Sequence, residues 1–448
     1  MSNISDLSLS FRIVRNYVVF CFKRYYGEYI VIGRENIPYD CPIIFAPNHI
    51  NALMDAIAVH SVVPANLPVI FLARADIFNN KTAAKILKFT KIVPAFRMRD
   101  GVENLGKNNE IFEQCVGILN QNKALGIMPE GNQGEQRKLR PLVKGIFRIS
   151  FAAQLPYHSN PKVKIIPIGI DYGDLVKFGK HIIINIGKPI EVSDYMTNYA
   201  ENPVSATNEI RDKLRKDLSN LSLNLASENH YECFEEVTEI ANNSILKKMQ
   251  LPDETVYRFA VRKKIGERLL DLEINNPEKI NELESLRVDY TKLLKTLNLK
   301  TWVLDQNIQS SSALILEGLK LFWTLPFYIY GFILNFLPFF IPVYLRKHII
   351  KAQYEGFFSS LQFGLGIFTF PIFYILQTIL FCCFVSTSWW GVMLFFILQY
   401  PFGKWAIKWN REMKKFIAKL RFKKMIKNKT SELLQAQSLR DQIIRIIS

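Results

Sequence analysis

Residues 356–403 form an uninterrupted run of 48 positions without Asp, Glu, Lys or Arg. A second charge-free run covers residues 321–345. A helix that spans a bilayer needs about 20 mostly apolar residues, so the longer run has room for two crossings. The polar break Ser-Thr-Ser at 386–388, followed by Trp389 and Trp390, predicts a turn with interfacial aromatic rings. We therefore expect a membrane-embedded region over residues 311–403 that supplies C-terminal transmembrane helices.

The sidedness of this region follows from its basic loops. Pro326, Pro338 and Pro342 disfavour a straight single span, so residues 321–345 are expected to be re-entrant or interfacial, or a short double crossing. Residues 346–351 are basic, which predicts that this loop faces the cytoplasm. The N-terminus resembles no secretory signal, and the six cysteines form no C-x-x-C pair. We expect an integral membrane protein with its soluble domain on the cytoplasmic face.

The excess positive charge gathers behind the apolar runs. The chain holds 57 Lys and Arg against 40 Asp and Glu, a net charge of +17. Residues 404–448 alone carry 13 basic and three acidic side chains, a net charge of +10. Aromatic residues are concentrated in the apolar runs and are sparser in this tail, which disfavours a nucleic-acid stacking surface. We predict a basic cytoplasmic tail over 404–448 that contacts a lipid bilayer with anionic headgroups, and no nucleic-acid partner.

Short β-branched runs alternate with helix-like stretches between residues 29 and 190. The strand-like runs are residues 29–32, 43–46, 69–73, 92–96, 124–128, 163–168 and 182–186. Helix-like stretches at 83–88 and 109–120 lie between them. Strands that alternate with helices in this way predict an α/β domain.

Helix-like segments flank this domain on both sides. Residues 1–27 mix aromatic with basic side chains, so this amphipathic N-terminal segment either lies on a membrane surface or packs on the following domain. Residues 201–310 are rich in charge and are predicted to form a helical domain. A helix with one packing face is expected to begin at Pro277. Its apolar positions recur every three or four residues at Leu283, Leu286, Tyr290, Leu293 and Leu297.

A histidine and an aspartate follow the strand-like run at residues 43–46. His49 and Asp55 are separated by five residues, in a turn that leads into a helix. A carboxylate bound to one ring nitrogen fixes the tautomer, so that the other nitrogen can act as a general base. A surface histidine beside an unrelated aspartate in a first helical turn would give the same spacing. The pair therefore needs support from other parts of the sequence.

Three further blocks supply that support. Residues 91–97 form a strand-like run that ends in an arginine, residues 128–131 read Met-Pro-Glu-Gly, and residues 165–168 form an apolar run that contains a proline. In this order, together with the His/Asp motif, they resemble the blocks of the phospholipid/glycerol acyltransferase family, the PlsC-like enzymes. The resemblance covers roughly residues 28–192. It implies an α/β acyltransferase domain over residues 28–200, a mixed sheet flanked by helices, with a helical insert and C-terminal transmembrane helices.

The resemblance also implies catalytic roles. His49 would deprotonate the hydroxyl group of the acceptor as that oxygen attacks a fatty acyl thioester, and Asp55 would orient the imidazole. A thiolate is a good leaving group, so no acyl-enzyme is required. Neither a metal nor a bound cofactor is expected, and acyl-CoA or acyl carrier protein would serve as co-substrate.

The substrate-binding residues come from the same comparison of motifs. Arg97 would hold the acceptor phosphate through its planar donor fork. Glu130 and Gly131 would line the acceptor site, where glycine allows a close approach of the backbone. Lys144 is a candidate for a further phosphate contact, and a plain solvated lysine is the alternative interpretation.

Departures from the family pattern concern the acceptor. The five-residue spacing of the His/Asp motif resembles the branch that contains the glycerol-3-phosphate/dihydroxyacetone-phosphate acyltransferases. Lys91 stands where Gly is usual, and Asn132 where Thr is usual. We expect a membrane-bound O-acyltransferase of phospholipid biosynthesis that acts on glycerol 3-phosphate or dihydroxyacetone phosphate. The alternatives are a 1-acylglycerol-3-phosphate acyltransferase that makes phosphatidic acid and, from another class, a non-catalytic membrane scaffold.

Overall fold

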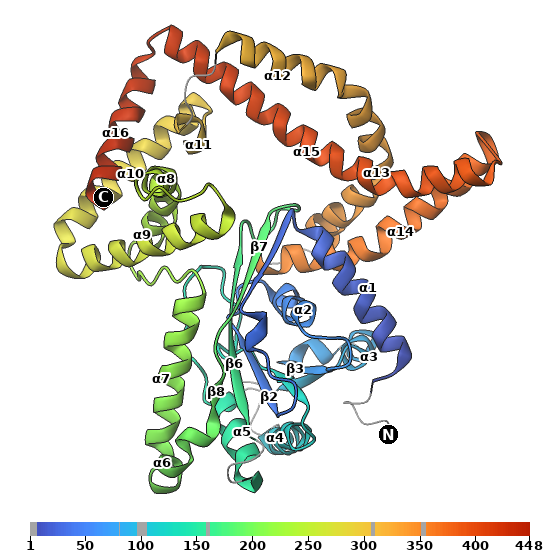
Figure 1. Cartoon of the computed structure of the whole chain (residues 1–448), viewed down its shortest axis with the longest axis vertical. Coiled ribbons are helices and arrows are strands. Elements are labelled where there is room, and N and C mark those ends of the chain that lie inside the picture. Colours follow the sequence, from blue (N-terminus) through green and yellow to red (C-terminus); the bar gives the residue numbers. More distant parts are fainter. Residues whose placement is uncertain (1–6, 80, 96–104, 158–161, 306–309, 351–354) are drawn as a thin grey trace. The chain divides into compact units, whose positions relative to one another are not determined.

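The computed structural model describes residues 7–79, 81–95, 105–157, 162–305, 310–350 and 355–448 (Figure 1). Contacts between residues divide the chain into two compact units. The first unit comprises Met1–Asn224 together with Ala352–Phe363, and the second comprises Leu225–Lys351 and Gly364–Ser448. The domain boundaries expected from the sequence at residues 27, 200, 310 and 403 stay predictions.

An eight-stranded sheet forms the centre of the first unit, with the order β1-β7-β6-β2-β5-β3-β4 and β8 paired to β6. Five neighbouring strands, β6, β2, β5, β3 and β4, run parallel, whereas β7 and β8 are antiparallel to β6. The mixed sheet flanked by helices is therefore confirmed. The strands are β1 (Glu28–Ile32), β2 (Ile43–Pro47), β3 (Val69–Arg74), β4 (Ile92–Ala95), β5 (Ala124–Gly126), β6 (Lys164–Tyr172), β7 (His181–Ile186) and β8 (Ile190–Glu191).

Two strands end two or more residues away from the sequence-based expectation. β5 ends at Gly126 instead of reaching residue 128, and β6 continues to Tyr172 instead of ending at residue 168. Pro167 lies within β6, where its carbonyl accepts a hydrogen bond from Gly187 N at 2.9 Å. β6 extends beyond residue 168 because it pairs with β7 from Ile168 onward, and no local sequence pattern predicts that pairing.

Helices cover both faces of the sheet (Figure 1). Adjacent residues of β2, such as Ile44 and Phe45, point to opposite faces, and both are fully buried. Strands that are buried on two faces read as continuous apolar runs, which explains the sequence pattern. The helices are α1 (Leu9–Tyr25), α2 (Ala52–Val62) and α3 (Lys81–Phe89) on one face, and α4 (Leu105–Leu119), α5 (Gly145–Gln154), α6 (Met196–Glu201) and α7 (Pro203–Leu221) on the other.

The N-terminal helix α1 packs on α2. The buried guanidinium of Arg15 donates to the carbonyl oxygens of His60 at 2.7 Å and Val63 at 2.6 Å, at the end of α2. These two bonds satisfy carbonyl groups that a helix C-terminus leaves without partners. Leu9 and Ile13 on the other side of α1 are exposed, so contact of this helix with a membrane surface stays a prediction.

The second unit contains a helical cluster made of α8 (Tyr231–Lys248), α9 (Thr255–Asn275), α10 (Pro277–Leu297), α11 (Thr301–Leu304) and α16 (Ser431–Ile447). α10 begins at Pro277, as its sequence predicts, and Leu283, Tyr290 and Leu297 are buried along it. α16 packs against α8 and α10, and Arg440 forms an ion pair with Asp305. The last part of the basic tail is therefore a packed helix.

The apolar runs also form helices, α12 (Ser311–Trp323), α13 (Leu325–Leu345), α14 (Phe358–Phe384) and α15 (Trp389–Lys427). Two helices are long and apolar enough to cross a membrane. The first is α13 together with the π-helical turn Arg346–Ile350 that continues it, with a mean hydropathy of 1.6, and the second is α14, with a mean hydropathy of 2.0. The predicted turn falls between α14 and α15. α15 starts with the paired tryptophans and carries ten Lys and Arg residues, all at or after position 404.

Polar side chains join the three apolar helices. Tyr374 of α14 donates to the amide oxygen of Asn335 on α13 at 2.6 Å, and Asn335 Nδ2 donates to the carbonyl of Gln399 on α15 at 3.1 Å. Gln399 Nε2 in turn donates to Thr378 Oγ1 at 2.9 Å. Interhelical hydrogen bonds of this kind hold apolar helices together where burial of apolar surface gives little driving force.

Candidate active site

The predicted motifs meet at one edge of the sheet. β2 leads into Asn48 and His49, β5 leads into the turn that contains Glu130, and β6 ends at Tyr172. Because these strands are parallel, their carboxyl ends lie on the same side, which is where open α/β sheets bind ligands. β4 ends at Ala95 on this side too, whereas Arg97 lies outside the described residues.

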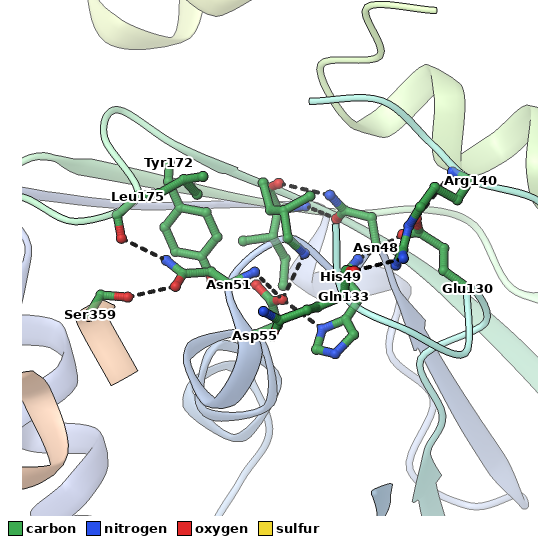
Figure 2. Close-up of polar contacts among 12 residues, drawn as sticks. Asn48, His49, Asn51, Asp55, Glu130, Gln133, Arg140, Tyr172, Leu175 and Ser359 are labelled. Carbon is green, nitrogen blue, oxygen red and sulfur yellow. Dashed lines mark hydrogen bonds and ion pairs between the residues drawn. The ribbon is translucent and has the colours of Figure 1, made fainter. Parts of the chain in front are cut away.

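His49 and Asp55 form a hydrogen-bonded pair (Figure 2). The distance from His49 Nδ1 to Asp55 Oδ2 is 2.9 Å. The side chain of Asp55 is fully buried, whereas that of His49 keeps 17% of its surface exposed. Within the described ranges, His49 Nε2 has no hydrogen-bond partner. With Nδ1 donating to the carboxylate, Nε2 carries the lone pair and is accessible, which is the arrangement of a general base.

The Asp55 carboxylate is the centre of a small network. Its Oδ2 atom also accepts the backbone N–H groups of Ile50 at 3.0 Å and Asn51 at 2.8 Å, and its Oδ1 atom accepts the hydroxyl of Tyr172 at 2.7 Å. The turn between the two motif residues holds Ala52 at φ 42°, a left-handed conformation that costs an L-residue about 1 kcal/mol. Four donors thus fix the orientation of one buried carboxylate.

Glu130 supports the backbone of His49. Glu130 Oε1 accepts the backbone N–H of His49 at 2.8 Å, while Oε2 accepts the backbone N–H of Arg140 at 3.1 Å and its Nε at 3.0 Å. The Glu130 side chain is 1% exposed. Burial raises the pKa of Glu130 above its ordinary value, while Arg140 and the N–H donors lower it. The carboxylate therefore binds the loop that carries His49 to the loop that carries Arg140.

Gly131 and Lys144 lie on either side of Val143. Gly131 takes φ +69°, and a Cβ atom there would lie 2.9 Å from Val143 Cγ1, so the position requires glycine. Gly131 N donates to the carbonyl of Met128 at 3.0 Å, which closes the turn, and Val143 N donates to the carbonyl of Pro129 at 2.7 Å. Lys144 is exposed just before α5, and no hydrogen bond within the described part of the chain joins it to His49 or Glu130. Its role stays a prediction.

Comparison with known proteins assigns this part of the chain to a family. Residues 28–171 match the family model described as Acyltransferase. The chain carries an acyltransferase-family domain. The matched segment includes the His/Asp motif, Glu130 and β6 up to its last residue but one.

Two curated relatives of the acyltransferase domain come from Saccharomyces cerevisiae. Glycerol-3-phosphate O-acyltransferase 2 is 22% identical over 294 residues, which is 61% of this chain and 38% of that protein. Glycerol-3-phosphate O-acyltransferase 1 is 23% identical over 145 residues, which is 32% of this chain and 19% of that protein. The chain thus spans well under half the length of these relatives.

A solved structure with a similar chain is the 1-acyl-sn-glycerophosphate (LPA) acyltransferase PlsC from Thermotoga maritima. The two chains align with a TM-score of 0.33 and 16% sequence identity, over 45% of this chain and 77% of that one.

The acyltransferase domain uses residues that the motifs did not single out. Asn48 extends the β2–β6 pairing, because its amide accepts Ile170 N at 2.7 Å and donates to Ile170 O at 3.1 Å. Tyr172 and Arg140 bind the two buried carboxylates. A polar side chain directly after a buried strand was the available signal for Asn48. Tyr172 has no such signal, because its partner lies 117 positions away.

The structure shows how Lys91 is accommodated at a position where glycine is usual in the family. The residue takes φ 65°, in the left-handed region that favours glycine, which is the residue usual at this position. Lys91 is buried just before β4, its carbonyl accepts Phe71 N at 3.0 Å, and its ammonium lies 5.3 Å from the centre of the Phe11 ring. These contacts offset the cost of the backbone conformation.

No group of three or more His, Cys, Asp or Glu side chains able to hold a metal ion occurs among the residues that the structure describes. The expected absence of a metal stays a prediction. A hollow of about 740 Å³ lies near Tyr39, Pro68 and Lys123, which precede β2, β3 and β5. It is therefore at the amino ends of the strands, on the opposite edge from His49.

The start of α14 packs against the His/Asp motif. Ser359 Oγ donates to Asn51 Oδ1 at 2.5 Å, and the backbone of Asn51 binds Asp55 (Figure 2). A Cβ atom at Gly356 would lie 3.1 Å from the carbonyl oxygen of Ile50. Ser359, more than 300 positions away in the sequence, thus supports the turn between His49 and Asp55 through a hydrogen bond.

Ser359→Ala is expected to lower kcat about fivefold and to destabilise the fold by about 1 kcal/mol, because Asn51 loses a buried hydrogen bond. Steady-state kinetics and thermal unfolding measure the two effects. Ser360→Ala is the matched control, since the Ser360 hydroxyl is buried without a partner among the described residues. Equal effects of the two substitutions would remove Ser359 from the support of the motif.

Proposed function

We propose that this chain is a membrane-bound O-acyltransferase of phospholipid biosynthesis. It transfers a fatty acyl group from a thioester, acyl-CoA or acyl carrier protein, to glycerol 3-phosphate or dihydroxyacetone phosphate. The observation that carries the proposal is the hydrogen-bonded pair of His49 and Asp55 at the carboxyl edge of an acyltransferase-family sheet. The names of the two yeast relatives support glycerol 3-phosphate as the acceptor.

In the proposed reaction, Nε2 of His49 takes the proton of the acceptor hydroxyl as that oxygen attacks the thioester carbonyl. The C–S bond then breaks, and the departing thiolate receives the proton from the imidazolium. Asp55 holds Nδ1 and stabilises the positive charge that develops on the ring. Because the thiolate leaves readily, His49 acts as a base and forms no bond to the acyl group.

The remaining residues bind substrate or support the base. Glu130 fixes the backbone of His49 through its 2.8 Å hydrogen bond, and this contact supports its proposed place beside the acceptor site. Gly131 lets the chain turn tightly next to it. Lys144 is proposed as a further contact to the acceptor phosphate, and its exposure before α5 is compatible with this role.

Arg97→Ala is expected to raise the KM for the phosphate-bearing acceptor about tenfold with little change in kcat, since a charged hydrogen bond contributes about 1.5 kcal/mol or more. Initial rates over a range of acceptor concentrations measure this effect. Arg34→Ala, at an exposed position of the same domain, is the control. An unchanged KM in Arg97→Ala would remove that side chain from the acceptor site.

The membrane carries the second part of the proposal. Two helices long and apolar enough to cross a bilayer, and a net charge of +10 over residues 404–448, support an integral membrane protein. The acyltransferase domain lies on the cytoplasmic face, and the basic half of α15 contacts anionic headgroups. Labelling of single cysteines near residue 310 and in the tail tests this sidedness, and opposite sides for the two would contradict it.

One experiment tests the reaction directly. Purified protein is incubated with labelled acyl-CoA or acyl carrier protein and a panel of acceptors, with His49→Ala in parallel. Acylation of glycerol 3-phosphate or dihydroxyacetone phosphate that depends on His49 is the expected result. Acylation of 1-acylglycerol 3-phosphate alone would replace the proposed acceptor. No transfer to any acceptor would leave the membrane scaffold as the better hypothesis.

A further inference from the structure

We propose that Tyr172 is a positioning residue for His49, which it controls through the carboxylate of Asp55. This inference rests on the proposed function, because it concerns the base of that reaction. Tyr172 is the last residue of β6 and lies one position beyond the segment that matches the family model.

The geometry gives the two oxygens of Asp55 different partners. Oδ2 binds His49 Nδ1 and the two backbone N–H groups of the turn, whereas Oδ1 binds the hydroxyl of Tyr172 at 2.7 Å. A carboxylate that is held at one oxygen alone can rotate about its Cβ–Cγ bond. The Tyr172 hydroxyl removes this freedom, because it anchors the second oxygen from the neighbouring strand.

Tyr172 is suited to act as a permanent donor. Its side chain is fully buried, and burial together with the nearby Asp55 raises its pKa well above the ordinary value. The hydroxyl therefore stays protonated throughout the pH range in which a histidine titrates. Within the described residues, Tyr172 and His49 are the side chains that donate to Asp55.

Other charged and titratable groups lie around Tyr172 and Asp55. Arg137 donates to the carbonyl oxygen of Tyr172 at 2.6 Å and lies 3.5 Å from the carboxylate of Asp171, which in turn lies 3.7 Å from His181 Nε2. Tyr26, which follows α1, packs against Tyr172, and burial together with the nearby Tyr25 and Asp55 raises the pKa of Tyr26 well above its ordinary value. Glu130 and Arg140, from the loop after β5, bind each other, and Glu130 also accepts the backbone N–H of His49. The hydrogen bond from Tyr172 is therefore the direct side-chain control on how strongly Asp55 attracts a proton on His49.

Removal of the Tyr172 hydroxyl changes how the negative charge of Asp55 acts on His49. When the hydroxyl is absent, the Asp55 carboxylate is stabilised by one donor fewer and attracts the protonated imidazole more strongly. The active, neutral form of His49 then needs a higher pH. The looser carboxylate also holds the ring less firmly against the acceptor, so the chemical step slows while substrate binding is unaffected.

Tyr172→Phe tests the proposal, with Tyr26→Phe as the matched control. The two rings lie 5.9 Å apart between centroids, both are buried, and each substitution removes one hydroxyl. The Tyr26 hydroxyl has no hydrogen-bond partner in the described part of the chain. A purely structural role of the hydroxyl would give both variants similar kinetics.

We expect Tyr172→Phe to lower kcat about tenfold at unchanged KM and to move the acid limb of the kcat/KM profile up by about half a pH unit. Tyr26→Phe should match the wild type in both measurements. A pH profile of Tyr172→Phe that coincides with that of Tyr26→Phe would overturn the proposal, as would a change in KM alone.

A second readout does not need the acyl-transfer assay. Diethyl pyrocarbonate modifies neutral imidazole, and peptide mass spectrometry follows its reaction with His49 as the pH changes. The midpoint should rise in Tyr172→Phe and stay constant in Tyr26→Phe; an unchanged midpoint in both would refute the role of Tyr172. If the wild type transfers no acyl group, the proposed function fails, while this titration still decides the inference.

A third variant tests the proposal without removing the hydroxyl. If Tyr172→Phe does not fold, 3-fluorotyrosine at position 172 keeps the ring and the hydroxyl and strengthens the donor, since fluorine makes the phenol more acidic. The acid limb and the modification midpoint should then move to lower pH. A shift to higher pH, or none, would contradict the proposal.

Discussion

His49→Ala is expected to lower the rate of acyl transfer about 10³-fold while the protein stays folded. The imidazole supplies the base for the acceptor hydroxyl, a contribution of about 10²–10⁴ in enzymes of many kinds. Its side chain is partly exposed and makes one hydrogen bond, to Asp55, so its removal leaves no large cavity. Steady-state rates with a labelled acyl thioester and thermal unfolding measure the two quantities.

A second histidine of the same domain serves as the control. His181 on β7 has Nε2 3.7 Å from Oδ2 of the buried Asp171, so it also forms a His/Asp pair. That pair belongs to another strand connection and takes no part in the proposed reaction, so His181→Ala should keep the wild-type rate per folded molecule. Full turnover by purified His49→Ala would refute the assignment of the base.

Glu130→Ala is expected to destabilise the protein by about 3 kcal/mol and to abolish measurable activity. The substitution leaves the backbone N–H of His49 and the guanidinium of Arg140 without their carboxylate. Breaking a fully buried pair costs about 3–5 kcal/mol, and the lower end applies here because the Arg140 side chain is 29% exposed. The loss of activity follows because the loop that carries His49 is no longer held. Thermal unfolding of the purified protein measures the destabilisation.

A milder substitution and a control accompany Glu130→Ala. Glu130→Gln keeps an oxygen for the backbone of His49 but loses the charge that faces Arg140, so a smaller loss of about 1–2 kcal/mol is expected. Glu110→Ala, on the exposed side of α4, should leave stability within about 0.5 kcal/mol of the wild type. A Glu130→Ala variant as stable as Glu110→Ala would show that the buried contacts carry little energy.

The two parts of the Pro-Glu-Gly block differed in how far the sequence could predict them. Gly131 takes a positive φ beside Val143, so its identity follows from local backbone geometry. The carboxylate of Glu130 turns toward the backbone of His49, which belongs to another strand connection. The spacing of residues 128–131 contains no information about that direction, because it depends on how β2 and β5 pair.

The apolar runs show the same division. The break at 386–390 and the helix start at Pro277 follow from local sequence, since turns and helix N-termini are written in a few adjacent residues. The packing of α16 against α8 and α10 does not, because those helices lie more than 100 positions earlier in the chain. Which residues of α16 are buried is decided by the helices that it contacts.

By itself, the sequence determined seven of the eight strands, the apolar helices and the pair of His49 and Asp55. Each of these depends on periodicity or on a spacing of a few residues, which the backbone converts directly into geometry. The tertiary structure alone decided what surrounds the pair: the hydroxyl of Tyr172 and the first turn of α14, brought in by strand pairing and packing over more than 100 positions. Contacts over such separations depend on the whole fold, so no local pattern records them.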